Sequence, residues 1–349
     1  MKERQSNFEL LRLLAIYMIV LIHINMYVYN FSSGAVALVY SNLINGICNT
    51  GVTLFILISG YFGVKLDVKK LTKLELRMII YSLIVLAIMF AIGYESYSFG
   101  DKLELAAKAL LPFISRNHWF YTCYVLIILF SGFINEFVNN LGEKKLRHLL
   151  ILMLVVFSIF PTFLYFEVVP DNGKGIVQML MVYMMGRYIR LYGEDFGEKN
   201  AKWFTPVFIC LWIINAVSHA FPIQLGGIYH TLCKDNSITN LIIAVCVFYL
   251  FKKMSFRSKL INTCAKYVFA IFAINYVLID ICVDAAMGKE GFIPANSFLG
   301  ILLLVAISLA IVIICIIIGI IRELLLAKVD EAIAGKLSSV IDAKIEKIS

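Results

Sequence analysis

The sequence predicts an all-α integral membrane protein, a bundle of about ten transmembrane helices with both termini in the cytoplasm. The composition, the long runs without charge and the distribution of Lys and Arg together predict this fold class. Of the 349 residues, 61% are apolar and 15% are charged, and the mean hydropathy is +0.87. Soluble globular domains average about 45–50% apolar and about 25% charged residues. The composition therefore excludes an ordinary soluble globule, and with only 6 Pro it also excludes a collagen-like chain.

Segments without charge mark the expected helices. A membrane span needs roughly 20 apolar residues, and no Asp, Glu, Lys or Arg occurs between Arg12 and Lys65. That stretch is too long for one span, and the polar turn at 30–34 divides it. An apolar segment at 103–115 with Lys and Glu spaced along it is expected to lie on the membrane surface. The expected spans lie near residues 8–29, 43–63, 77–95, 119–138, 148–168, 176–192, 203–221, 237–252, 265–285 and 297–321.

The basic residues alternate between the two sides of this bundle. Of the 31 Lys and Arg, 24 lie in the N-terminus, the tail and every second loop, 6 lie in the other loops, and Arg12 lies inside the first span. Cytoplasmic loops carry the excess of Lys and Arg, so both termini are expected in the cytoplasm. The formal charge of +8 follows from this asymmetry, and no nucleic-acid partner is expected. The expected location is the lipid bilayer of the cell membrane, such as the cytoplasmic membrane of a bacterium.

Domain organisation is simple. Residues 1–325 are expected to form one multi-span membrane domain, and residues 326–349 an amphipathic cytoplasmic tail. The 8 Cys lie in or beside apolar segments, and none forms a Cys-x-x-Cys pair. They therefore predict neither a disulfide framework nor a zinc site, and no metal is expected. The oligomeric state has no signature in the sequence.

Ionisable residues within the first span are the strongest functional candidates, because charge inside a membrane is costly. Arg12 and His23 are eleven residues apart, so they share one helix face and lie about 16 Å apart along the axis. Glu9 lies one turn before Arg12 on the same stripe and can hold it as an ion pair. Two structural interpretations stay open: Arg12 reaching the lipid headgroups, and His23 serving as a hydrogen-bonded packing residue.

Further motifs follow this pair in the chain. They are GVTLFILISGYF at 51–62, KKLTK at 69–73 with Arg77 and Tyr81, NHWF at 117–120 with Tyr124, SGFIN at 131–135, and YMMGRYIR at 183–190. Together with Glu9, Arg12 and His23, these motifs resemble the acyltransferase-3 family of membrane O-acyltransferases. The likeness covers roughly residues 7–195, and the later spans agree by number and hydropathy.

The resemblance implies transfer of an acyl group, commonly acetyl, from cytoplasmic acetyl-CoA to a hydroxyl of a cell-surface or envelope glycan at the outer face. His23 would be the general base, because an imidazole near neutral pH can take the proton of a sugar hydroxyl. Arg12, held by Glu9, would bind the CoA phosphates together with Lys73 and Arg77. Acetyl-CoA would be a substrate, and no tightly bound cofactor is expected.

Acceptor binding has four candidates: Ser59, Asn117, Trp119 and Tyr124. Trp119 and Tyr124 begin the fourth span at its outer end, where either a sugar-stacking wall or an aromatic belt would place them. Ser59 and Gly60 either contact the acyl group or allow two helices to approach closely. Asp280, near the outer end of the ninth span, is either a solvated rim carboxylate or a contact for a polar acceptor.

Two departures from the family pattern and one alternative remain. The paired-arginine motif expected at the third span is here Lys73-x-x-x-Arg77, and a His that many members carry late in the chain is replaced by Asn275, which cannot titrate. The alternative is a multi-span transporter or flippase of a small solute or lipid-linked sugar. It predicts Gly- or Pro-broken spans at corresponding positions of two halves. The 6 Pro and the absence of an internal repeat argue against it.

Overall fold

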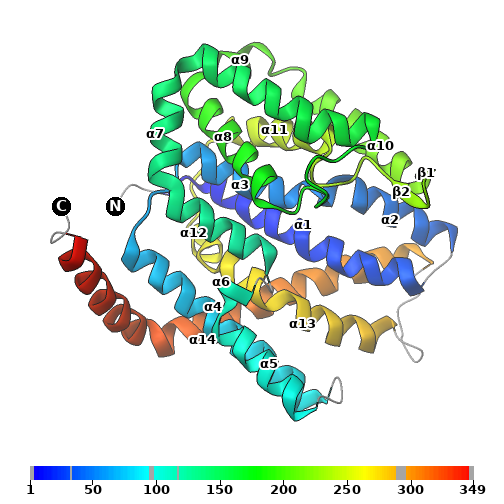
Figure 1. Cartoon of the computed structure of the whole chain (residues 1–349). Helices are drawn as coiled ribbons and strands as arrows, with labels where there is room; N and C mark the ends of the chain where they lie inside the picture. Colours follow the sequence, from blue (N-terminus) through cyan, green and yellow to red (C-terminus); the bar gives the residue numbers. More distant parts are fainter. Residues whose placement is uncertain (1–3, 32–33, 94–97, 116–117, 288–295, 346–349) are drawn as a thin grey trace.

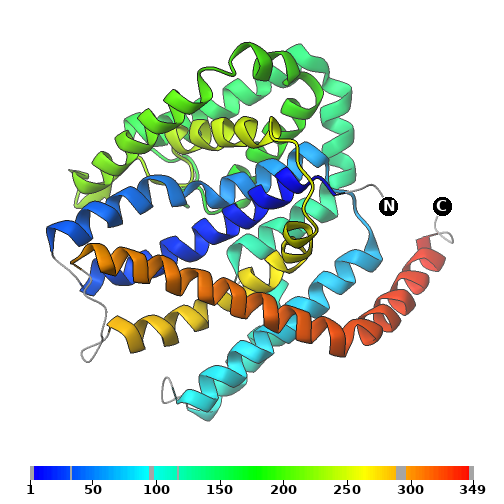
Figure 2. The same ribbon diagram turned by 180° about the vertical axis from the view of Figure 1, so that it is seen from behind.

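The computed structural model describes residues 4–31, 34–93, 98–115, 118–287 and 296–345, which fold into a bundle of helices with one short hairpin (Figures 1 and 2). In chain order the elements are α1 Ser6–Phe31, α2 Ala35–Cys48, α3 Thr50–Phe62, α4 Val68–Ile92, α5 Phe99–Leu110, α6 Pro112–Ser115, α7 Trp119–Leu154, η1 Val155–Leu164, α8 Ile176–Tyr192, α9 Glu194–Lys199, α10 Phe204–Ala220, β1 Ile223–Leu225, β2 Ile228–His230, α11 Ile238–Lys252, α12 Lys259–Cys264, η2 Ala265–Tyr267, α13 Val268–Met287 and α14 Phe298–Ile345.

Each of the ten expected spans coincides with a helix or a helical run, so the all-α prediction is confirmed. In the described part of the chain, six runs are long and apolar enough to cross a membrane. One of them, Trp119–Leu164, has 46 residues and contains two of the expected spans. The helices α10 and α11 are apolar but shorter. The number of crossings and the side of each terminus stay predictions.

Local hydrogen bonds explain where the helix boundaries differ from the expected ones. The second expected span, 43–63, begins earlier, because α2 and α3 form one run of 28 residues from Ala35 to Phe62. The polar residues Asn45 and Asn49 do not end it, since their side-chain amides donate to the carbonyls of Ser41 and Asn45, four residues back, at 3.0 and 3.2 Å. Their donors are therefore satisfied inside the helix.

The expected surface helix at 103–115 is also shifted. It begins at Phe99, because Ser98 and Asp101 form a capping box, with each side chain accepting a hydrogen bond from the other residue's backbone N–H. A capping box satisfies two of the free donors at a helix start. The helix ends before Pro112, which begins the short α6.

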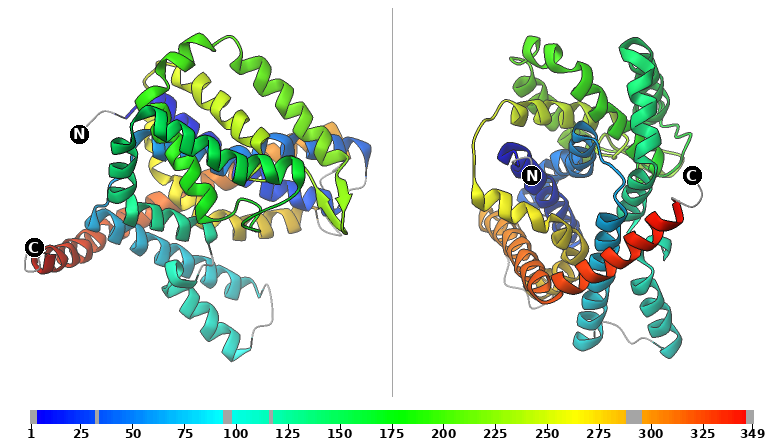
Figure 3. Two further views of the ribbon diagram at one scale, coloured as in Figure 1. Left: turned by 45° about the horizontal axis from the view of Figure 1, so that its top comes forward. Right: turned by 90° about the vertical axis from the view of Figure 1, so that its left-hand side faces the viewer.

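The central helix of the bundle is α1, with packed helices on two sides (Figures 1 and 3). Leu11 and Ala15 are fully buried in a core shared with α3, α8 and α11. Ile16 and Val20 are buried in a second core shared with α4, α13 and α14. Residues that follow each other on α1 thus face different cores, which places its polar stripe along the boundary between the two groups of helices.

A close helix crossing joins α3 and α8. A Cβ atom at Gly60 would overlap the carbonyl oxygen of Tyr183, and a Cβ atom at Gly186 would overlap the carbonyl oxygen of Leu57. Small residues permit such backbone contact in membrane helix pairs. The packing interpretation of Ser59 and Gly60 is confirmed for Gly60.

The expected tail is helical as far as the structure describes it, and it continues the helix of the last expected span. Residues 298–345 form one helix of 48 residues, α14, and the expected domain boundary at 325 and 326 lies inside it. Its C-terminal part extends past the bundle (Figure 2). Arg322 and Asp330, both buried on α14, form a bidentate ion pair.

Candidate active site

A cavity of about 440 Å³ lies beside the C-terminal half of α1. Its walls come from α1, α4, α5, α13 and the start of α7. The residues that can hydrogen-bond and line it are His23, Ser82, His118, Trp119, Asn275, Tyr276 and Asp280. Aliphatic and aromatic side chains of α4, α5 and α13 form the rest of the wall. The cavity thus combines a few polar groups with a mostly apolar lining, as small-molecule sites do.

His23 is the polar residue that α1 contributes to this cavity. Its Nδ1 lies 3.3 Å from Oδ1 of Asn275 on α13, and its ring meets Tyr276 edge-on with centroids 5.8 Å apart. Sequence reasoning treated Asn275 only as a departure from a family pattern. The contact spans 252 positions in the chain, and no local pattern could have indicated it.

Two of the predicted site residues, His23 and Trp119, line the same cavity. Trp119 and Phe120 come from the first turn of α7, and Phe120 packs against Phe272 of α13 with ring centroids 5.3 Å apart. Tyr124 stacks on the far side of Phe120, at 5.9 Å and an interplanar angle of 7°, and does not line the cavity. Trp119 and Phe120 thus form an aromatic part of the cavity wall, to which Tyr124 does not contribute.

The remaining acceptor candidates lie elsewhere. The Ser59 hydroxyl donates to the carbonyl of Phe55 on its own helix at 2.9 Å, at the α3–α8 crossing and away from the cavity. Asn117 lies outside the described residues. Asp280, in contrast, lines the cavity and accepts a hydrogen bond from Tyr27 of α1.

Ser82 of α4 is a cavity residue that sequence reasoning missed. Its hydroxyl oxygen is shielded from solvent and has no hydrogen-bond partner among the residues that the structure describes. A buried hydroxyl without a partner costs free energy, so a ligand in the cavity would gain from bonding to it. A single Ser in an apolar span gives no sequence signal.

The other end of α1 carries charge instead of a cavity. Arg12 donates to Glu9 at 2.7 Å, which is the ion pair expected from their spacing. Glu9 is buried, and Arg4 lies 3.6 Å from its second oxygen. The Arg12 guanidinium also lies over the ring of Phe62, 5.6 Å from its centroid. Arg12 thus bonds inside the protein rather than only reaching toward headgroups.

An aromatic cluster of Phe8, Tyr61 and Phe62 connects this end of α1 with α8. Phe8 stacks on Tyr61 at 5.4 Å, and Arg190 of α8 donates to the Tyr61 hydroxyl at 3.1 Å. Arg12 and Arg190 therefore flank one aromatic cluster. Arg190 belongs to the YMMGRYIR segment, a signal that sequence reasoning used only for the family likeness.

The predicted donor residues on α4 form a separate basic group. Lys73 and Lys69 both pair with Glu331 in the C-terminal part of α14. Arg77 lies one turn further along α4, beside Lys266 and Arg322, around a small cleft. Among the described residues, neither Lys73 nor Arg77 forms a hydrogen bond or ion pair with Arg12. The part played by Glu331 could not be predicted, because its partners are about 260 residues away.

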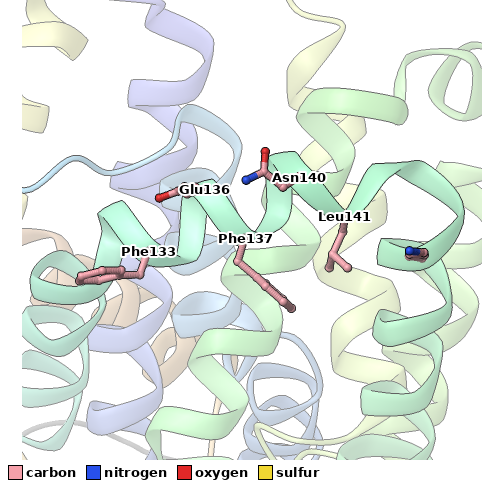
Figure 4. A pocket seen from close by; sticks show the side chains of 6 residues that line it. Phe133, Glu136, Phe137, Asn140 and Leu141 are labelled. Atoms are coloured by element: carbon pink, nitrogen blue, oxygen red, sulfur yellow. The ribbon is translucent and has the colours of Figure 1, made fainter.

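A second hollow, of about 390 Å³, lies on α7 alone (Figure 4). Phe133, Phe137 and Leu141 lie along one side of the helix, and Glu136 and Asn140 lie on the other. Lys145 lines it as well, so the hollow spans Gly142, whose φ of +71° bends α7. None of the predicted site residues lines it, so the His23 cavity is the candidate active site.

Comparison with known proteins identifies the family. A profile of the acyltransferase domain family matches residues 5–320. The match covers α1, the cavity and the first part of α14, and it favours an enzyme over the transporter alternative. The comparisons with curated proteins and with solved structures gave no match. The chain therefore belongs to the acyltransferase-3 family and is a multi-span membrane acyltransferase.

Proposed function

We propose that this protein transfers an acyl group, most simply acetyl, from cytoplasmic acyl-CoA to a hydroxyl of a cell-surface or envelope glycan. The observation that carries the proposal is that His23 and Trp119, from two motifs far apart in the chain, line one cavity. An aromatic ring beside a base suits a carbohydrate, because the ring packs on the sugar while the base meets its hydroxyl.

The proposed reaction uses His23 as general base. Its ring takes the proton of the acceptor hydroxyl while the hydroxyl oxygen attacks the thioester carbonyl carbon. The new C–O bond forms, the C–S bond breaks, and the proton passes from the imidazolium to the departing CoA thiolate. His118, Asp280 and Ser82 are available on the cavity wall to hold the acceptor.

The proposed donor site lies at the Arg12 end of α1. The phosphates of CoA and its thioester are at opposite ends of the molecule, which fits a cationic group and a base separated by about 16 Å of helix. Arg12 and Arg190 offer guanidinium groups for phosphate, and Lys73 and Arg77 offer further positive charge. Acetyl-CoA acts as a co-substrate in this scheme, without a resident cofactor or metal.

The test compares envelope glycans of a strain lacking the gene with the parent strain by mass. Loss of acetyl-sized increments in the deletion strain, restored by the wild-type gene, supports the proposal. Purified protein in lipid nanodiscs should then release CoA from acetyl-CoA only when glycan is present. Unchanged glycans together with altered solute uptake would contradict it and favour the transporter.

A further inference from the structure

The side chain of Asn275 is held in one orientation. Asn275 is buried on α13, and its amide nitrogen donates to the backbone carbonyls of Ile271 and Phe272, both at 2.8 Å. A primary amide has two N–H donors, so both are used inside α13. The atom left to face α1 is the amide oxygen, Oδ1.

This orientation determines where the proton of His23 lies. Oδ1 can only accept a hydrogen bond, and it lies 3.3 Å from Nδ1 of His23. The bond therefore requires a proton on Nδ1. A neutral imidazole carries one N–H, so Nε2 keeps a free lone pair on a ring that lines the cavity.

We propose that Asn275 is a positioning residue that holds His23 in the Nδ1–H tautomer, so that Nε2 is the atom that takes the proton of the acceptor hydroxyl. This inference rests on the proposed function. When Nε2 is protonated, Nδ1–H stays bonded to the amide oxygen, which supports the cation without carrying a charge itself. Because an amide does not titrate, the proton leaves again through Nε2.

The chain contains an internal comparison for this contact. His219 of α10 places its Nδ1 2.7 Å from Oδ1 of Asn42 on α2, and neither residue lines the cavity. Asn42→Ala removes a His–Asn contact of the same type at a position that has no part in the reaction. It is the matched control for Asn275→Ala.

The test reads the tautomer directly. Protein labelled with ¹⁵N-histidine is purified in nanodiscs at a pH where the imidazoles are neutral, and its ¹⁵N spectrum is recorded. The chain has 5 His, and the signals missing from His23→Ala identify His23. We expect protonated Nδ1 and unprotonated Nε2 in the wild type. In Asn275→Ala we expect a shift toward the Nε2–H form.

Activity gives the second readout. Asn275→Ala should lower kcat about 10- to 100-fold, less than loss of the base itself, with little change in the KM for acceptor. Asn275→Asp keeps an acceptor oxygen for Nδ1–H but loses both N–H donors to the α13 carbonyls, so it should restore the Nδ1–H tautomer and only part of kcat. Asn42→Ala should leave kcat unchanged while altering the signals of His219.

The proposal and the function fail in different ways. A wild-type His23 that carries its proton on Nε2, or a tautomer unchanged in Asn275→Ala, overturns the positioning role whatever the enzyme does. An active His23→Ala variant overturns the general-base role of His23, whereas the measurement of the His23 tautomer stays valid. If Asn275→Ala does not reach the membrane, the wild-type spectrum and the Asn275→Asp variant decide the question.

Discussion

The two ends of α1 differ in how their polar groups are satisfied. At the N-terminal end Arg12 is paired with Glu9 and packed on Phe62, and the nearby lysines of α4 are paired with Glu331. At the other end His23 and an unpartnered Ser82 hydroxyl border a cavity of about 440 Å³. At one end the positive charges are paired with carboxylates of the same chain, whereas at the other end hydrogen-bonding groups border an open space.

This difference indicates what each end can bind. An anionic ligand at the Arg12 end would have to exchange with carboxylates that are already in place. A ligand at the His23 end would enter open space. It would form hydrogen bonds with groups that lack a partner, such as the Ser82 hydroxyl. Under the proposed function, the phosphates of acyl-CoA would displace carboxylates at the first end, and the acceptor would fill open space at the second.

The largest expected effect comes from removing the base at the cavity end. His23→Ala should lower acyl transfer about 10²- to 10⁴-fold, the usual loss for a general base, with normal abundance in the membrane. Acetyl content of the glycan and quantitative detection of the protein in membranes are the measurements. His219→Ala is the control, because His219 bonds to Asn42 in a comparable contact outside the cavity. Full acetylation by a well-expressed His23→Ala variant would eliminate the general-base role.

At the charged end, Arg12→Ala should raise the KM for acyl-CoA about 10- to 100-fold, since a hydrogen bond to a charged group contributes about 1.5–3 kcal/mol. Arg12→Lys should be milder, because the charge is kept and the bidentate geometry is lost. Initial rates against acyl-CoA concentration measure the effect, and the KM for acceptor is the control. The same KM for acyl-CoA in the wild type, Arg12→Ala and Arg12→Lys would mean that the phosphates bind elsewhere.

The helix crossing near the charged end is expected to tolerate no side chain. Gly60→Ala would push a methyl group into the backbone of α8, and overpacking of this kind costs about 1–3 kcal/mol or more. Thermal unfolding in detergent measures the loss. Gly132→Ala on α7 is the control, since no atom of the described chain would lie within 4 Å of its added methyl. Equal melting temperatures for the two variants would show that the α3–α8 contact is not rigid.

The ion pairs of Lys69 and Lys73 with Glu331 predict opposite effects on the KM for acyl-CoA when either partner is changed. Lys73→Ala should raise the KM for acyl-CoA, whereas Glu331→Gln should lower it by at most about fivefold, because solvent-exposed ion pairs contribute little. Glu143→Gln is the control, because it makes the same charge change at an exposed carboxylate that pairs with Arg147, 3.7 Å away on the same helix. A rise in the KM of Glu331→Gln would mean that the carboxylate positions the lysines rather than competing for them.

The smallest expected effect concerns Asp235, in the loop before α11. Burial raises the pKa of its carboxyl to about 7, whereas an unfolded Asp titrates near about 3.9. Between these values the folded protein binds more protons than the unfolded chain, so stability should fall as pH rises from about 4 to about 7. Melting temperatures across this range should fall less in Asp235→Asn. Asp195→Asn, at an exposed carboxylate, is the control. If melting temperature falls with pH equally in the wild type and in Asp235→Asn, the pKa of Asp235 is not raised.

Sequence reasoning succeeded wherever a single helix carries the information. Apolar runs located helices at all ten expected ranges, and the i, i+3 spacing of Glu9 and Arg12 predicted their ion pair. Boundaries were less accurate, since Asn45 and Asn49 were free to bond within their own helix. The basic group on α4 was found as a charge pattern, but its pairing with α14 was not.

By itself, then, the sequence determined the fold class, the helix positions, the polar stripe of α1 and the family, because periodicity and charge patterns repeat within one segment. Only the tertiary structure decided which helices face that stripe. The contacts of His23 with Asn275, of Tyr61 with Arg190 and of Lys73 with Glu331 join residues more than 120 positions apart. Those pairings depend on the order of helices around α1, which is set by side-chain packing among many segments and by crossings such as that of Gly60 with α8.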